Sequence, residues 1–335
     1  MAKKFFALIV VLTMVLGITG CGSQSTGNQQ GDTKKTEEST EKPKNEKLVI
    51  GFAQIGQESG WRDAETFSIL QEAEKLGVDL KFSDAQQKQE NQIKAIRTFI
   101  QQGVDVIGVA PVVETGWETV FKEAKDAGIP IILVDRRAAV PEDLYASFIG
   151  SDFILEGNNA ADEMAKLLNN KGNIVELQGT VGASAATDRM KGFKDQLAAK
   201  YPDMKIIASQ TGDFTRAKGK EVMEAFLKAY PGQINGVYGH NDDMVLGAIE
   251  AIKDAGLKPG VDIKTVSVDG VKGLFEAMAA GEANVTVECN PLLGPQFFKA
   301  CQDLKDGKTT EKWIKSEESV YRAETAKDDL PNRKY

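Results

Sequence analysis

Short apolar runs alternate with helix-length amphipathic segments along this chain from residue 48 to residue 288. The runs are rich in Val and Ile and are bounded by turn residues, which is typical of strands buried on both faces of a parallel sheet. Strands are expected at 48–53, 78–83, 104–110, 130–135 and 145–150, and in a second series at 173–178, 204–210, 234–239, 263–269 and 283–288.

The segments between these runs carry apolar residues at three- and four-residue spacing. Helices are predicted over 66–76, 115–127 and 242–255, and each is followed by a glycine suited to a left-handed C-cap. Strand–helix alternation predicts a doubly wound α/β architecture. Ten strands are many for one small domain, so we expect two similar Rossmann-like lobes, each with a parallel sheet.

The N-terminus has the form of a bacterial lipoprotein signal. Lys3 and Lys4 precede an apolar segment at 5–18, and small residues then lead to Cys21. We therefore predict a signal peptide over 1–20 and a lipid on Cys21, with a plain secretory signal as the alternative. Residues 22–46 contain no Val, Ile, Leu, Met or aromatic residue, so 21–46 is expected to be a lipidated cysteine and a flexible tether.

Charge and reactive side chains exclude several functions. The formal net charge is −8 and no basic stripe is present, so nucleic acid is not an expected partner. His240 is the single histidine, which leaves too few ligands for a zinc site, and no metal or other cofactor is expected. Cys289 and Cys301 could form a disulfide, but free buried thiols are favoured because one follows a predicted strand and the other lies inside the next helix.

Aromatic, arginine and acidic residues follow the predicted strands. Ligands of open parallel sheets bind beyond the carboxyl ends of the strands, so these residues are the candidate site: Trp61, Asp135, Arg136, Arg189, Phe214, Asn241 and Asp269. A sugar needs fixed acceptors, planar donors and aromatic faces for its C–H surface, and this set supplies all three. Amino-acid ligands would use Arg and Asp as well and stay open at this point.

Several of these residues also have structural interpretations. Asp135 and Arg136 could be a surface ion pair, Asn241 could only cap the following helix, and Asp269 could belong to a turn. Neither a P-loop nor a G-x-G-x-x-G follows the first strand, which disfavours a nucleotide. No nucleophile elbow or paired Ser–His is present, so an enzyme is not expected, although Asp135 and Asp269 could serve as paired carboxylates.

Six segments together resemble the periplasmic sugar-binding proteins of ABC importers, of the ribose-binding type: 58-ESGWR-62, 134-VDRR-137, 178-QGTVGASAATDRMKGF-193, 212-GDFTRAKGKEVME-224, 240-HNDDMVLGAI-249 and 267-SVDG-270. The resemblance runs from about residue 48 to the end. It implies sugar contacts for six residues that match the family pattern: Asp135, Arg136, Arg189, Phe214, Asn241 and Asp269.

Departures from the ribose binders lie in the first segment. Trp61 and Arg62 stand where those proteins carry two adjacent phenylalanines, and Ser59 replaces an Asn. The pattern resembles the galactofuranose binders, which implies that Glu58, Ser59, Trp61 and Arg62 face the sugar. A further family glutamine falls near Cys289, and Glu288 lies beside that position.

The resemblance also implies a domain plan. Three hinge segments near 150, 290 and 317 would join an N-terminal lobe (47–150 and 290–316) to a C-terminal lobe (151–289 and 317–335). The expected protein is a monomeric, extracytoplasmic lipoprotein that delivers a monosaccharide, with galactofuranose favoured, to an ABC permease. Another aldose (arabinose, galactose, ribose or xylose), a receptor serving a sensor kinase, and a sugar-processing enzyme are the alternatives.

Overall fold

The computed structural model describes residues 47–335, which belong to one compact unit. The predicted signal peptide, the lipid site at Cys21 and the tether up to residue 46 lie outside the described residues. Within the described part, no helix combines the length and the apolar character needed to cross a bilayer.

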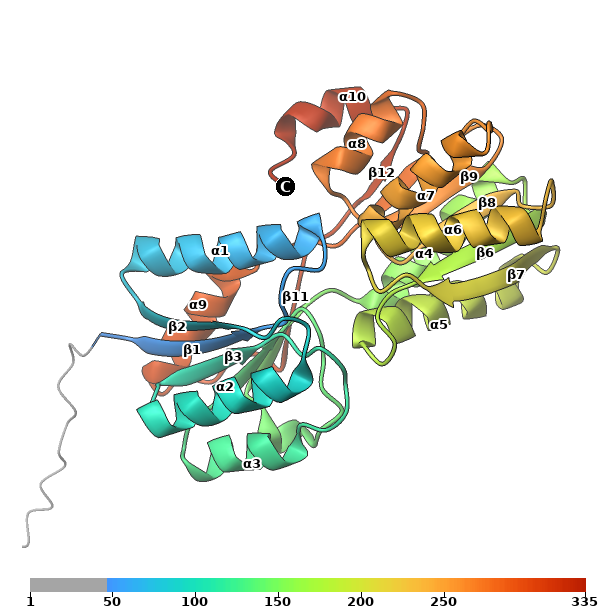
Figure 1. Ribbon diagram of the computed structural model, residues 1–335. Coiled ribbons are helices and arrows are strands. Elements are labelled where there is room, and N and C mark those ends of the chain that lie inside the picture. Colours follow the sequence, from blue (N-terminus) through green and yellow to red (C-terminus); the bar gives the residue numbers. More distant parts are fainter. Residues whose placement is uncertain (1–46) are drawn as a thin grey trace, which may run out of the picture. The chain divides into compact units, whose positions relative to one another are not determined.

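The first lobe is built on a six-stranded parallel sheet with strand order β11-β5-β4-β3-β1-β2. Its strands are β1 (Val49–Gln54), β2 (Asp79–Asp84), β3 (Val106–Val109), β4 (Ile131–Val134), β5 (Ser147–Gly150) and β11 (Trp313–Lys315). Helices α1 (Gly60–Leu76) and α9 (Gly294–Lys305) cover one face, and α2 (Gln89–Gln102) and α3 (Glu118–Asp126) cover the other (Figure 1). A short 3-10 turn, η1 (Glu142–Leu144), precedes β5.

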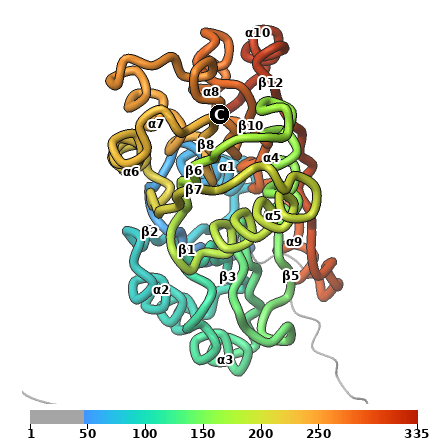
Figure 2. Tube along the Cα trace, turned by 90° about the vertical axis from the view of Figure 1, so that its right-hand side faces the viewer, coloured from blue at the N-terminus to red at the C-terminus, as the bar shows by residue number. Residues whose placement is uncertain are grey.

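The second lobe repeats this plan with strand order β12-β10-β9-β8-β6-β7. Its strands are β6 (Gly172–Gln178), β7 (Met204–Thr211), β8 (Gly236–Gly239), β9 (Lys264–Asp269), β10 (Val285–Glu288) and β12 (Val320–Arg322). Its helices are α4 (Phe153–Leu167), α5 (Ser184–Lys200), α6 (Arg216–Ala229), α7 (Asp242–Asp254), α8 (Lys272–Ala279), α10 (Ala326–Asp329) and the 3-10 turn η2 (Leu330–Asn332). Figure 2 shows α6 and α7 on one side of the strands, and α4 and α5 on the other.

Alternation along the strands explains the layers of the first lobe. Ile107 and Val109 belong to a core cluster with residues of α2 and α3, whereas Val106 packs in a separate cluster with residues of α1 and α9. Successive side chains of a strand point to opposite faces, so a strand covered on both faces must be apolar throughout. This is why β3 and β4 read as unbroken apolar runs.

The predicted doubly wound fold with two similar parallel-sheet lobes is confirmed, and the first five strands of each lobe have the same order. The edge strands β11 and β12 were not predicted. Each has only three residues, half-buried or exposed, and therefore lacks the apolar run of a central strand. β12 is also antiparallel to β10, which departs from the all-parallel prediction.

The chain passes between the two sheets three times. It leaves the first sheet after β5, returns between β10 and α9, and crosses again between β11 and β12. Each lobe is therefore completed by segments distant in sequence. The carboxyl ends of the central strands of both lobes meet near these crossings, where the candidate site lies.

Candidate functional site

A cavity lies between the lobes at the carboxyl ends of the strands. Its lining comes from both lobes: Glu58, Ser59, Trp61, Arg62, Asp135, Arg136, Ala185, Arg189, Phe214, Asn241, Asp269 and Cys289. The structure thus brings together all the predicted site residues except Glu288.

The helix predicted over 66–76 begins six residues earlier, because α1 starts at Gly60 and so includes Trp61 and Arg62. Ser59 is the N-cap, and its hydroxyl accepts a hydrogen bond from the Arg62 N–H at 3.2 Å. Trp61 and Arg62 therefore stand on a rigid helix start. The Gly60 N–H donates to the Asp243 carboxylate of the second lobe at 2.8 Å, so this helix end also contacts the opposite lobe.

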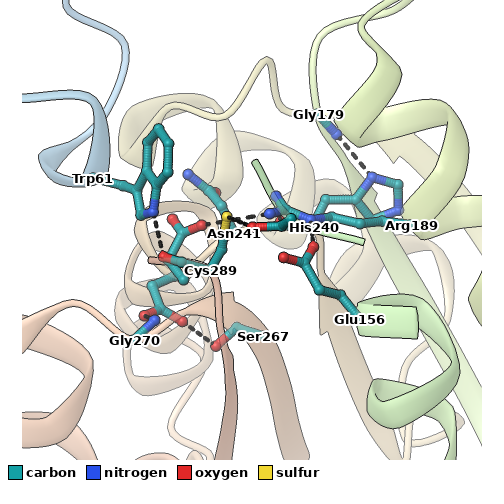
Figure 3. Close-up of polar contacts among 12 residues, drawn as sticks. Trp61, Glu156, Gly179, Arg189, His240, Asn241, Ser267, Gly270 and Cys289 are labelled. Carbon is teal, nitrogen blue, oxygen red and sulfur yellow. Dashed lines mark hydrogen bonds and ion pairs between the residues drawn. The ribbon is translucent and has the colours of Figure 1, made fainter. Parts of the chain in front are cut away.

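Trp61 reaches across to the second lobe. Its indole N–H donates to the Cys289 carbonyl at 2.5 Å, and its ring packs within the core cluster of the second lobe (Figure 3). The Arg62 guanidinium lies 4.8 Å from the centroid of the Trp61 ring. The ring is 4% exposed. It lines the cavity and also joins the two lobes through the Cys289 carbonyl.

Arg62, Arg136, Glu58 and Asp135 form a buried ionic network on the first lobe. Arg62 pairs with Asp135 and lies 3.4 Å from Glu58, and Arg136 donates to the same Glu58 oxygen at 2.5 Å. Burial alone would lower the pKa of Arg62, but Asp135, Glu58 and Glu65 raise it above its usual value. The two cations are thereby held in fixed directions beside the cavity.

Arg189 is the corresponding cation of the second lobe (Figure 3). Its Nε donates to Glu156 at 2.7 Å and its Nη1 to the His240 carbonyl at 2.7 Å, while its Nη2 lies 3.9 Å from Asp269. Burial alone would lower the pKa of Arg189, but Glu156 and the other acidic neighbours raise it. His240 lies behind the cavity, and its ring accepts from the Gly179 N–H at 3.3 Å and pairs with Glu176 at 3.2 Å.

Phe214 forms the opposite aromatic wall. The Arg136 guanidinium of the first lobe lies 4.9 Å from the centroid of its ring. The Asn241 side chain donates to the Phe214 carbonyl at 3.0 Å and also caps α7 by accepting from the Met244 N–H. Asn241 therefore has the predicted capping role and lines the cavity as well.

Several buried polar atoms of the lining have no partner within the described residues: Arg62 Nε, Arg136 Nε and Asp269 Oδ2. Buried polar groups are nearly always hydrogen-bonded, so unpaired atoms beside a cavity indicate a polar ligand. Burial raises the pKa of Asp269 well above its usual value. A carboxyl group in that state can donate as well as accept, which is what a hydroxyl requires.

Glu288 is the predicted residue that does not line the cavity. It precedes Cys289 at the end of β10, and neighbouring positions of an extended chain point to opposite sides. Its carboxylate bonds to Arg333 at 3.0 Å and to Tyr335 at 2.9 Å, near the C-terminus. Cys289, the next residue, therefore lies on the side that lines the cavity.

Two residues important to the site were missed by the sequence analysis. Ala185 lines the cavity at the start of α5, and Glu156 holds Arg189 from α4. A signal for Glu156 exists, because it lies between Phe153 and Ala160 on the buried stripe of α4. A carboxylate in an apolar stripe predicts a buried partner.

The two cysteines of the described chain are free and buried, as predicted. Cys289, Glu156 and Glu318 form the single grouping of potential metal ligands found among residues 47–335, with their ligand atoms within 4.8 Å of one another. Arg189 already occupies one side of Glu156, which makes this grouping less favourable for a cation.

Comparisons with known proteins agree with this geometry. A family model described as a periplasmic binding protein domain matches residues 50–309. The chain is 54% identical over 295 residues to the galactofuranose-binding protein YtfQ of Escherichia coli (strain K12), covering 86% of this chain and 92% of that protein.

Solved structures show the same similarity. A crystal structure of a galactofuranose binding protein superimposes with a TM-score of 0.83 at 55% identity, covering 86% of this chain and 98% of that one. The binding protein of the arabinose ABC transporter from Shewanella sp. ANA-3, bound to α- and β-L-arabinofuranose, gives a TM-score of 0.83 at 53% identity, covering 86% and 96%. The chain belongs to the periplasmic binding protein domain family.

Proposed function

We propose that this protein is an extracytoplasmic receptor that binds a monosaccharide in its furanose form between the two lobes. The observation that carries the proposal is the cavity lining, in which two aromatic walls enclose three arginines and three acidic residues. Each arginine is already paired with a carboxylate (Arg62 with Asp135, Arg136 with Glu58, and Arg189 with Glu156), so a neutral, hydroxyl-rich ligand matches this lining better than an acid or an amine.

The choice of sugar follows from the relatives. A galactofuranose binder and an L-arabinofuranose binder are each more than 50% identical to the chain, which favours a furanose over ribose-type ligands. Galactofuranose is the preferred ligand and L-arabinofuranose the second candidate.

Delivery to an ABC permease and anchoring through a lipid on Cys21 complete the proposal, with a single chain acting as a monomer. The protein is proposed to release its ligand unchanged. Of the two carboxyl groups that could serve as a catalytic pair, Asp135 is bound to Arg62, which makes it a weak base for a hydrolase and supports binding without chemistry.

Calorimetry against a monosaccharide panel tests the proposal. D-galactose and L-arabinose, which supply furanose forms at equilibrium, should bind, while D-ribose and D-xylose should bind weakly. Absence of heat and of thermal stabilisation with every sugar would contradict the proposal, and turnover of a labelled sugar instead of stoichiometric retention would indicate an enzyme.

A further inference from the structure

Each of the three chain crossings places one hydrogen-bonding or acidic side chain at a common point. Ser151 follows β5, Cys289 follows β10, and Glu318 lies between β11 and β12. The Ser151 hydroxyl donates to the Glu318 carboxyl, and the same hydroxyl lies 3.2 Å from the Cys289 sulfur. These contacts link all three crossings through the Ser151 hydroxyl.

Glu156 brings a second carboxyl group to this point. One carboxyl oxygen of Glu156, one carboxyl oxygen of Glu318 and the Cys289 sulfur all lie within 4.8 Å of one another. Glu156 is buried and Glu318 is half-buried, and two carboxylates this close together cannot both be ionised at low cost, so one of them retains a proton.

Arg189 decides which carboxyl group keeps the proton. It forms a 2.7 Å ion pair with Glu156, which favours the ionised form of that residue, although burial raises the pKa of Glu156. Burial and the charge of Glu156 raise the pKa of Glu318 to about 8. Burial and Glu156 also raise the pKa of Cys289, which stays a thiol.

The groups that face Glu318 come from every element packed around it: Glu156 of α4, Arg189 of α5, the Cys289 thiol, the Ser151 hydroxyl and the Asn290 N–H. Asp135 of the first lobe adds negative charge near Glu156 and Cys289. Among these groups Arg189 is the one cation, and Glu156 already holds it.

We propose that Glu318 is a positioning residue of the ligand site, that it carries a proton when the lobes are closed, and that ligand binding takes up this proton. Glu318 acts through Cys289, whose carbonyl holds Trp61, and through Glu156, which holds Arg189. Because Cys289 lines the cavity, separation of the lobes brings water to this cluster and lowers the pKa of Glu318 toward that of a free carboxyl group.

The direction of the pH effect follows from the difference in the pKa of Glu318 between the closed and the open form. The closed form binds more protons than the open form between the two pKa values of Glu318, so closure is favoured at lower pH. Ligand affinity is then lost as pH rises from about 4.5 to about 8, by at most about tenfold per pH unit, and is constant above that window.

Carboxyl ¹³C NMR of protein labelled at glutamate tests the proton directly. With saturating D-galactose or L-arabinose, one glutamate resonance should titrate near pH 8, and in the ligand-free, open protein the same resonance should titrate near the ordinary value of a glutamate, about 4.5. This resonance should disappear in Glu318→Gln. The neighbouring exposed residue supplies a matched control, because Glu317→Gln removes the same charge and should leave that resonance in place. If sugar binds but every glutamate of the sugar-bound protein titrates below about pH 6, the inference is wrong and the proposed function stands.

Calorimetry of D-galactose or L-arabinose binding at pH 7, in phosphate and in Tris, tests the link to the ligand and rests on the proposed sugar binding. Wild type and Glu317→Gln should take up close to one proton per sugar, and their affinity should fall between pH 6 and pH 8. Glu318→Gln should take up none and bind with little pH dependence. Sugar binding without proton uptake in wild type, or an unchanged pH profile in Glu318→Gln, overturns the inference and leaves the proposed function intact.

Discussion

Three side chains of the cavity stand on backbone that residues other than glycine rarely adopt. Asp135 and Phe214 both have φ of 61°, and Asp269 has φ of 134°. Asp135 directly follows β4, Phe214 lies in the turn after β7, and Asp269 is the last residue of β9. Such conformations cost about 1–3 kcal/mol each and persist where the surrounding structure enforces them. Their occurrence at three lining positions supports a functional constraint on this end of the sheets.

Trp61 is the lining residue with the largest expected effect on binding. We predict that Trp61→Ala weakens sugar binding by ~2–4 kcal/mol, because it removes a buried aromatic wall and the hydrogen bond to the Cys289 carbonyl. The ring packs against the opposite lobe only when the lobes are closed, so the thermal midpoint of the open, ligand-free protein should change little. Titration calorimetry and thermal unfolding measure the two effects.

Trp61→Phe is the control, because it keeps a smaller aromatic wall and loses the indole N–H. It should bind sugar with an affinity between those of wild type and Trp61→Ala. Wild-type affinity in Trp61→Ala would show that the ligand lies elsewhere.

Gly179 makes room for the second aromatic wall. A Cβ at this position would lie 2.0 Å from the Phe214 ring, which has no space to yield because it is 3% exposed. Gly179→Ala should therefore displace the ring and weaken binding by ~1–3 kcal/mol. Calorimetry with the sugar measures the loss; equal affinities for Gly179→Ala and wild type would exclude Phe214 as a ligand wall.

Helices α4 and α5 pack closely enough to bring Glu156 and Arg189 together. A Cβ at Gly192 would lie 2.3 Å from the Ile154 carbonyl oxygen, and one at Gly157 would lie 2.5 Å from the Arg189 carbonyl oxygen. Both conflicts involve backbone atoms, which cannot move independently of the helices. The two glycines thus set the helix separation on which the buried ion pair depends.

Gly192→Ala should destabilise the protein by ~1–3 kcal/mol or more, because the helices must separate. Urea denaturation followed by circular dichroism measures the free energy of unfolding. Gly273→Ala is the matched control: its nearest neighbour is the end of the Leu246 side chain at 3.3 Å, which can rotate away, so it should change stability little. Equal stability of both variants would contradict the close-packing argument.

Contacts between the lobes hold the molecule in the closed arrangement. The Glu114 N–H donates to the Gly182 carbonyl at 2.8 Å, and Arg137 pairs with Asp188. Asp243, at the start of α7, accepts from the first N–H of α1 and also pairs with Arg216. These contacts can form only when the lobes approach, so they contribute to the closure equilibrium and hence to apparent affinity.

Asp243→Ala should weaken sugar binding by ~0.5–1.5 kcal/mol without contacting the ligand, because it removes a carboxylate from the N-terminus of α1 across the cleft. Small-angle scattering of the ligand-free variant should show a larger radius of gyration than wild type. Asp254→Ala, in the last turn of α7 and paired only with Lys220, is the control and should leave both quantities unchanged. An unchanged affinity in Asp243→Ala would show that this contact does not bias closure.

Local pattern predicted much of this protein. The ten principal strands follow from burial on both faces, which forces apolar runs such as β3 and β4. Seven candidate residues were also found without the structure, because ligands bind where strands end, and the family resemblance added Glu58, Ser59, Arg62, Glu288 and Cys289. Eleven of the twelve predicted lining residues do lie at one cavity, and Glu288 is the exception.

Only the tertiary structure decided which charges meet. The Arg62–Asp135 pair joins residues 73 positions apart, and the Ser151–Glu318 contact joins residues 167 positions apart. Edge strands β11 and β12 likewise exist because neighbouring strands offer free hydrogen-bonding edges, and their own residues carry no strand pattern. The sequence by itself determined which segments are buried on one or both faces, because the pattern of apolar residues is local. Which distant polar groups pair with one another was decided only by the tertiary structure, because pairing depends on how the segments pack together.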